Sequence, residues 1–237
     1  GLSLVQPFLD EKTLYVATLR EGVKAFDLKT KKEIWSTSLT KNKVNARVWS
    51  GFSFDKETNS LFVVTSNPGG IIGENRSGDD FSASLISINA DNGKIKWEYK
   101  HVVNDLWDFD LISNPIIVKK LKVINKKKLI NCVIALSKTG DVIMVDIDTG
   151  LPIFDNSYVD VLVQKSDMKN VYTPPTQKFY LKPEKFSNIE VDLDNGFDHL
   201  EEDNFNFMKN KLRRGNDIFL STLNKYNIYI ITNNFNC

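Results

Sequence analysis

Short runs of apolar residues alternate with polar turns along most of the chain. The runs are about four to eight residues long and rich in Val, Ile, Phe and Tyr, which favours β-strands over helices. We therefore predict a largely all-β protein, with strands at residues 14–18, 23–26, 61–65, 85–88, 129–136, 142–145 and 228–232.

A ten-residue pattern recurs three times, at residues 26–35, 88–97 and 145–154. Each copy has an apolar residue, an Asp or Asn, a polar turn and a closing aromatic residue. Asp, Asn and Thr side chains bond turn amides, and Gly accepts positive φ, so each copy predicts a β-hairpin. We expect the closing residues Trp35 and Trp97 to be packing residues of the repeat.

Repeats of roughly 40–50 residues with loop insertions are typical of the blades of a β-propeller. Such a ring must close to protect its strand edges, and this chain is long enough for about three or four blades. We predict an incomplete propeller over residues 1–237, with an irregular insertion at 155–215. A capping pattern at residues 198–201 predicts a short helix in the insertion, ending near Gly215.

Composition narrows the classes of partner. With 31 basic and 30 acidic side chains the net charge is +1, so we predict no nucleic-acid partner. The basic segment 119–128 is interpreted as a solvated hairpin loop.

Cys132 and Cys237 form neither a metal-binding spacing nor a disulfide framework. No run approaches the ~20 apolar residues of a membrane span. The first residue is not Met, and we expect a piece of a longer protein.

Three acids surround a tryptophan in the segment Asn104-Asp-Leu-Trp-Asp-Phe-Asp110, which we call the acid segment. If it is extended, Asp108 and Asp110 share one side, and Asp105 is interpreted as a turn cap. A surface loop would tolerate all three without any function. A glycosidase using two of them is disfavoured, because its carboxylates flank the substrate at ~5–10 Å and usually come from separate elements.

The acid segment and four other stretches, 49–70, 84–100, 135–154 and 173–183, resemble the pyrroloquinoline quinone (PQQ) dehydrogenases. The closest likeness is to the branch of membrane-bound quinoprotein glucose dehydrogenases, which includes quinate/shikimate enzymes. The resemblance implies an eight-bladed propeller that holds PQQ and a divalent ion, usually calcium, near its axis.

The same resemblance implies an oxidoreductase that oxidises an aldose sugar or polyol and passes the electrons to ubiquinone or another acceptor. It also implies a periplasmic location, with attachment to the inner membrane only through segments outside this chain. We expect the isolated chain to be inactive, because part of a ring cannot enclose the cofactor.

The resemblance assigns roles to five residues. Asp108 matches the catalytic base, and Lys138 the catalytic lysine that contacts the quinone oxygens of the cofactor and stabilises the charge of the reduced ring. Trp49 aligns with the tryptophan under the PQQ ring. Asn67 matches an amide ligand of the metal ion. Asp110 stands where relatives that use lanthanide ions have a further ligand, so another divalent or a lanthanide ion could replace calcium.

Val103 and Asn104 depart from the glucose-type relatives, which have two histidines at these positions, so the substrate is not predicted more finely. An alternative function is a non-catalytic propeller with the same repeats that binds other proteins as a scaffold. Such a scaffold has no chemical reason to combine Trp49, Asn67, Asp108 and Lys138, which favours the enzyme.

Overall fold

The computed structural model describes residues 3, 5–18, 21–40, 46–66, 81–103, 105, 109–124, 126–160, 175–186, 202–204 and 206. The chain forms two compact units, Gly1–Phe186 and Ser187–Cys237. In the second unit, residues 202–204 and 206 are helical and fall inside the predicted helix. The rest of that helix and the predicted strand at 228–232 lie outside the described residues.

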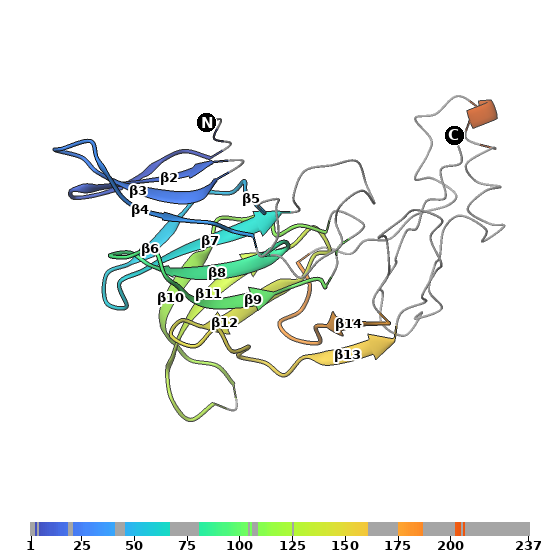
Figure 1. Ribbon diagram of the computed structural model, residues 1–237. Coiled ribbons are helices and arrows are strands. Elements are labelled where there is room, and N and C mark those ends of the chain that lie inside the picture. The colour runs from blue at the N-terminus through green and yellow to red at the C-terminus, as the bar shows by residue number, and fades with distance from the viewer. Residues whose placement is uncertain are drawn as a thin grey trace. The chain divides into compact units, whose positions relative to one another are not determined.

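The first unit consists of antiparallel sheets that follow one another in chain order (Figure 1). The all-β prediction is confirmed, and so are six of the predicted strands. The first sheet contains β1 (Phe8–Asp10), β2 (Thr13–Thr18), β3 (Gly22–Asp27) and β4 (Glu33–Thr37). The second contains β5 (Arg47–Val48), β6 (Ser53–Asp55), β7 (Ser60–Ser66), β8 (Ser84–Asn89) and β9 (Ile95–Lys100). The third contains β10 (Ile116–Leu121), β11 (Ile130–Leu136) and β12 (Val142–Asp146).

The second sheet is covered on both faces, and β7 shows this residue by residue. Leu61 and Val63 belong to the apolar cluster shared with the first sheet. Phe62 and Val64 belong to the cluster shared with the third sheet. Side chains alternate between the two faces of a strand, so a strand buried on both faces reads as an unbroken apolar run. The stacked sheets are therefore packed as neighbouring blades.

The closing tryptophan of each of the first two hairpins packs on the turn of the next hairpin. Trp97 donates a hydrogen bond from Nε1 to the carbonyl of Ile147, at 3.1 Å. A Cβ built on Gly150, which has a φ of +69°, would lie 2.6 Å from the Trp97 ring. Trp35 packs on Gly93 in the same way. The predicted packing role of both tryptophans is confirmed, and the structure shows that each contacts the hairpin that follows it.

Replacing Gly150 with alanine is expected to lower the free energy of unfolding by about 2 kcal/mol, because the methyl group overpacks the indole and a side chain is strained at positive φ. Urea denaturation followed by tryptophan fluorescence measures the change. Asp148→Ala is the matched control, since Asp148 lies in the same turn with an exposed side chain. Equal stability of the Gly150→Ala protein and the wild type would contradict this packing.

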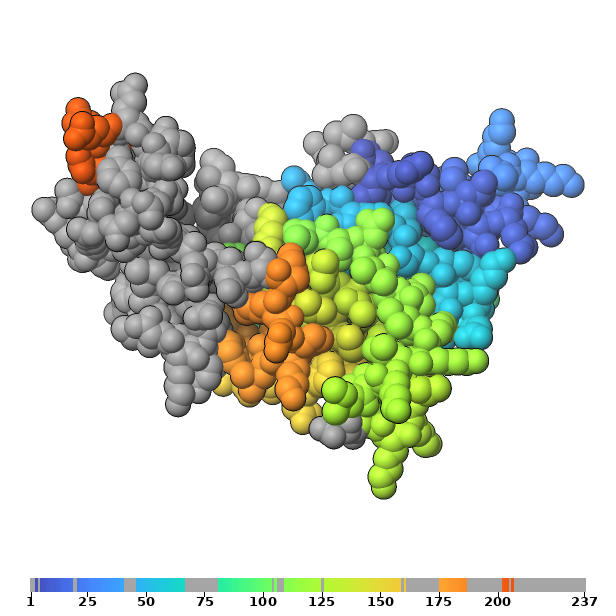
Figure 2. All heavy atoms as spheres, turned by 180° about the vertical axis from the view of Figure 1, so that it is seen from behind, coloured from blue at the N-terminus to red at the C-terminus, as the bar shows by residue number. Residues whose placement is uncertain are grey.

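A two-stranded sheet, formed by β13 (Ser157–Asp160) and β14 (Thr176–Phe179), follows the third sheet in the chain. Both strands fall in the range 155–215, whose limits as an insertion stay a prediction. Among the residues that the structure describes, no helix is long and apolar enough to cross a membrane. Figure 2 shows residues 175–186, in orange, against the third sheet.

Candidate active site

Lys138, Asp110 and Trp49 come together from three separate segments of the first unit. The Lys138 Nζ lies 2.7 Å from the Asp110 Oδ2. The same nitrogen lies 4.8 Å from the centroid of the Trp49 ring. The structure therefore brings together three of the five residues to which the resemblance assigned roles.

Main-chain hydrogen bonds explain why these side chains meet. Lys138 lies in the turn between β11 and β12, and its N–H donates to the carbonyl of Asp110 at 3.0 Å. The next residue, Leu111, forms an antiparallel bridge with Ser137. Trp49 donates from Nε1 to the carbonyl of Leu111 at 2.8 Å. The end of the acid segment is thus held between the turn that carries Lys138 and the indole ring of Trp49.

The charges at this site are paired and partly shielded from water. The Asp110 side chain is 4% exposed, whereas that of Lys138 is 32% exposed. A buried carboxylate requires a partner, and the ammonium group supplies it. An ammonium near an aromatic face is further stabilised by the ring quadrupole. The arrangement offers a flat apolar surface beside a fixed positive charge, which suits a planar, electron-accepting ligand.

Two of the predicted site residues, Asp108 and Asn67, lie outside the described residues. Asp105 is 1% exposed, so it is buried rather than displayed on a surface loop. Within the described ranges, no group of three or more His, Cys, Asp and Glu side chains could hold a metal ion. Metal binding by Asp110 stays a prediction.

A buried polar network, which was not predicted from the sequence, adjoins the turn that carries Lys138. His101 follows β9, and its Nδ1 lies 3.1 Å from the Tyr180 hydroxyl oxygen. Its Nε2 lies 3.3 Å from the Thr139 hydroxyl oxygen and 3.8 Å from the Asp141 carboxylate. Thr139 and Asp141 belong to the turn that carries Lys138. One signal was available, because His101 continues the alternating buried face that begins with Trp97.

Burial is expected to make stability depend on pH through His101. Desolvation lowers its pKa from 6.5 to about 4; the Asp141 carboxylate acts in the opposite direction, and the Lys178 and Lys185 ammonium groups lower it further. Below pH 6.5 the unfolded chain therefore binds more protons than the folded one. The contribution to stability is fully present above that pH and is lost as the pH falls; at pH 4 the loss amounts to about 3 kcal/mol.

The free energy of unfolding should therefore be about 2 kcal/mol lower at pH 5 than at pH 7 because of His101 alone. Urea denaturation at the two pH values measures this difference. The His101→Gln variant is the control. It is expected to be less stable at pH 7 but to lose this part of the pH dependence. An unchanged difference between the two pH values in the variant would show that other groups cause it.

Comparison with known proteins gives a consistent set of similarities. Residues 36–229 match the family described as "PQQ: Glucose/ethanol/alcohol dehydrogenase, beta-propeller domain". The chain is 31% identical over 133 residues, 55% of its length, to a probable quinate dehydrogenase (quinone) of Xanthomonas campestris pv. juglandis. It is 27% identical over 177 residues, 66% of its length, to a quinoprotein glucose dehydrogenase of Gluconobacter oxydans. The matched parts make up only 16% and 21% of those relatives.

Solved structures show the same fold at low identity. The quinohemoprotein alcohol dehydrogenase from Comamonas testosteroni matches 63% of this chain and 27% of its own, with a TM-score of 0.54 and 20% identity. A europium-containing methanol dehydrogenase matches 62% of this chain and 32% of its own, with a TM-score of 0.54 and 21% identity. These likenesses support a propeller of stacked antiparallel sheets.

Proposed function

Because this chain belongs to the PQQ family of glucose/ethanol/alcohol dehydrogenase β-propeller domains, we propose that it is part of a quinoprotein dehydrogenase. The enzyme oxidises an aldose sugar or polyol and passes the electrons to ubiquinone or another quinone. The observation that carries the proposal is the arrangement of Lys138 between the Asp110 carboxylate and the Trp49 ring.

The donor set at the site fits PQQ, a planar quinone that bears carboxylates. Trp49 offers a flat ring that is fixed in place by its hydrogen bond to Leu111. Lys138 offers a cation whose position is set by Asp110. When bound, PQQ would accept the hydride, which carries both electrons and which no protein side chain can accept. Lys138 would stabilise the negative charge that develops on the quinone oxygens, and the positioned cation needs no reorganisation to do so.

Asp108 is proposed to take the proton of the substrate hydroxyl as the hydride leaves carbon. Asn67 and Asp110 would hold calcium, or another divalent or a lanthanide ion, through oxygen ligands that suit a hard cation. Among the described residues Asp110 is the one proposed ligand, and its carboxylate is already paired with Lys138. We therefore assign no catalytic step to the ion.

The substrate class and location are proposals drawn from the family. The relatives matched above are named for quinate and glucose. Val103 and Asn104 stand where the glucose-type relatives have two histidines, so an aldose or polyol is proposed without a single substrate. The proposed location is the periplasm, attached to the inner membrane through segments outside this chain.

The test uses the natural protein that contains this chain, incubated with PQQ and Ca²⁺. Dye reduction is followed with glucose, other aldoses, polyols and quinate. We expect a change in PQQ absorbance on substrate addition, together with turnover. If neither occurs, the enzyme is ruled out and a non-catalytic, protein-binding propeller is favoured.

A further inference from the structure

Residues 175–186, which we call the bracing segment, contact both segments that carry the candidate active site. The bracing segment contains β14 and the chain that follows it, and it lies against the third sheet (Figure 2). Its start contacts the chain just before the acid segment. Its end contacts the turn at residues 137–141, which carries Lys138. Both contacts span a long sequence separation, so they fix tertiary rather than local structure.

Gln177, in β14, holds the start of the acid segment. The Val103 N–H donates to the Gln177 Oε1 at 3.1 Å. The Gln177 Nε2 donates back to the Val103 carbonyl at 2.7 Å. One buried side chain thus satisfies both main-chain groups of a residue, as a neighbouring strand would. Val103 immediately precedes the acid segment, five positions before Asp108.

Lys185 and the residue after it hold the lysine turn. The Lys185 Nζ lies 3.0 Å from the Asp141 Oδ1 and donates to the Thr139 carbonyl at 3.0 Å. The Phe186 N–H donates to the Gly140 carbonyl, also at 3.0 Å. These groups are at least half-buried apart from Phe186, so water competes weakly for the Lys185 contacts. This turn also forms a main-chain hydrogen bond to Asp110, at the end of the acid segment.

We propose that Gln177 and Lys185 are positioning residues, which hold the two ends of the acid segment at a fixed separation from Lys138. The bracing segment thereby sets the placement of Val103 and Asp110 relative to Lys138 without supplying a catalytic group itself. Correct placement matters because small displacements of reacting groups reduce rates strongly. The catalytic part of this inference rests on the proposed function, whereas the mechanical part does not.

The test compares the Gln177→Ala and Lys185→Met variants of the natural protein with the wild type. Each is expected to raise amide hydrogen exchange about fivefold at residues 109–112 and 135–141, because a buried hydrogen bond contributes about 1 kcal/mol. Exchange at residues 13–18, in the first sheet, should not change. With PQQ and Ca²⁺, turnover of Gln177→Ala should fall about tenfold, while PQQ affinity stays within about twofold.

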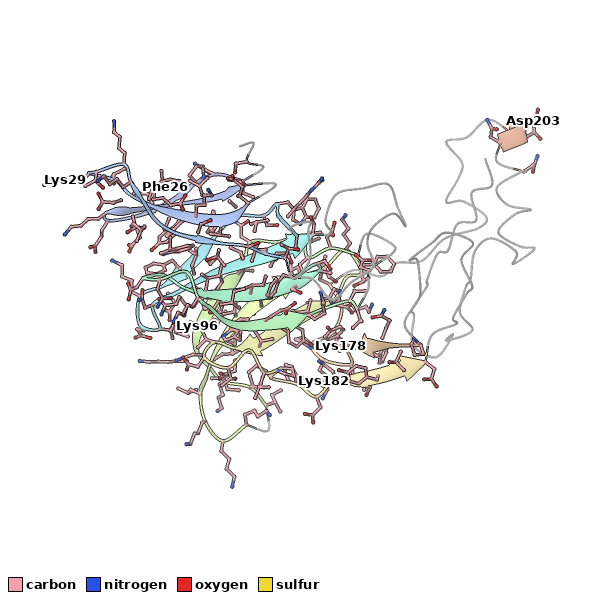
Figure 3. The ribbon with its side chains drawn as sticks, viewed as in Figure 1. Phe26, Lys29, Lys96, Lys178, Lys182 and Asp203 are labelled. Atoms are coloured by element: carbon pink, nitrogen blue, oxygen red, sulfur yellow. The ribbon has the colours of Figure 1, made fainter. Side chains whose placement is uncertain are left out.

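Matched controls lie in the same segment. Thr176→Ala changes the neighbouring residue of β14. Lys182→Met removes the same charge as Lys185→Met from an exposed side chain, labelled in Figure 3. Both should behave as wild type. Gln177→Glu retains the bond from the Val103 N–H and loses the one to its carbonyl, so its turnover should lie between those of the wild type and Gln177→Ala.

Two exchange results would overturn the proposal. One is unchanged exchange at 109–112 in Gln177→Ala, and the other is an equal rise at residues 13–18, which would mean a general loss of stability. If Gln177→Ala does not fold, Gln177→Glu and Lys185→Met decide by the same readout. A wild-type protein that neither binds PQQ nor turns over substrate would refute the proposed function, whereas the exchange results would still decide whether the bracing segment holds the site.

Discussion

Replacing Asp108 with asparagine is expected to lower turnover of the PQQ-loaded protein by about 10²–10⁴-fold, the usual contribution of a general base. An amide has nearly the same shape as a carboxylate but cannot accept the hydroxyl proton. PQQ affinity should therefore change little. Dye reduction gives turnover, and the absorbance of bound PQQ gives affinity.

The prediction for Asp108 rests on the resemblance of the acid segment and on the anchoring of its neighbour Asp110 at the site. Asp105→Asn is the control, because it makes the same chemical change three positions earlier. Asp105 is buried and is predicted to be structural, so its variant should lose stability but keep turnover per folded molecule. Wild-type turnover by Asp108→Asn would refute the assignment of the base.

Replacing Lys138 with methionine is expected to lower turnover by about 10²–10³-fold, because a positioned charge that stabilises developing negative charge is lost. Stability should fall as well. The Asp110 side chain is 4% exposed and would lose its cation. Removing one partner of a buried ion pair costs about 3–5 kcal/mol, and we expect the lower end because Lys138 itself is partly exposed. Dye reduction and urea denaturation measure the two effects.

The double variant Lys138→Met/Asp110→Asn separates the two roles of Lys138. Replacing the buried carboxylate with an amide should restore most of the lost stability, since a neutral amide is less costly to bury than a charge. Turnover should stay low, because the cation is still absent. Lys138→Arg keeps the charge and should fall between wild type and Lys138→Met. Recovery of turnover in the double variant would show that Lys138 acts only by neutralising Asp110.

Local chemistry made the hairpins predictable from the sequence. Turn residues and the closing aromatics fix each hairpin within ten residues, so β8 and β12 lie where predicted. β9 was harder to recognise, because its sequence IKWEYK alternates charged and aromatic residues and contains no apolar run. β14 begins directly after Pro175, inside the range predicted to be an irregular insertion. Its partner β13 is 16 or more residues earlier, and pattern alone does not reveal such pairing.

The candidate site was only partly predictable for a similar reason. Resemblance identified Trp49, Asp110 and Lys138 separately. The ion pair of Lys138 with Asp110 depends on the register that sets Leu111 opposite Ser137, and no local pattern encodes that register. The Gln177 contact with Val103 was missed because an amide that bonds main-chain groups leaves no distinctive spacing. Long-range contacts of this kind could not be predicted from local sequence patterns.

The packing of each closing tryptophan on the next hairpin also bears on which insertions, duplications and deletions such a protein can tolerate. The second hairpin receives the Trp35 ring at Gly93 and places its own Trp97 ring against Gly150 of the third hairpin. Nearest-neighbour contacts of this type make stability roughly a sum over adjacent units. Duplication or loss of a whole repeat would keep each ring matched to a glycine turn. An insertion inside one hairpin would disturb two junctions, so length variation should accumulate in the loops between repeats.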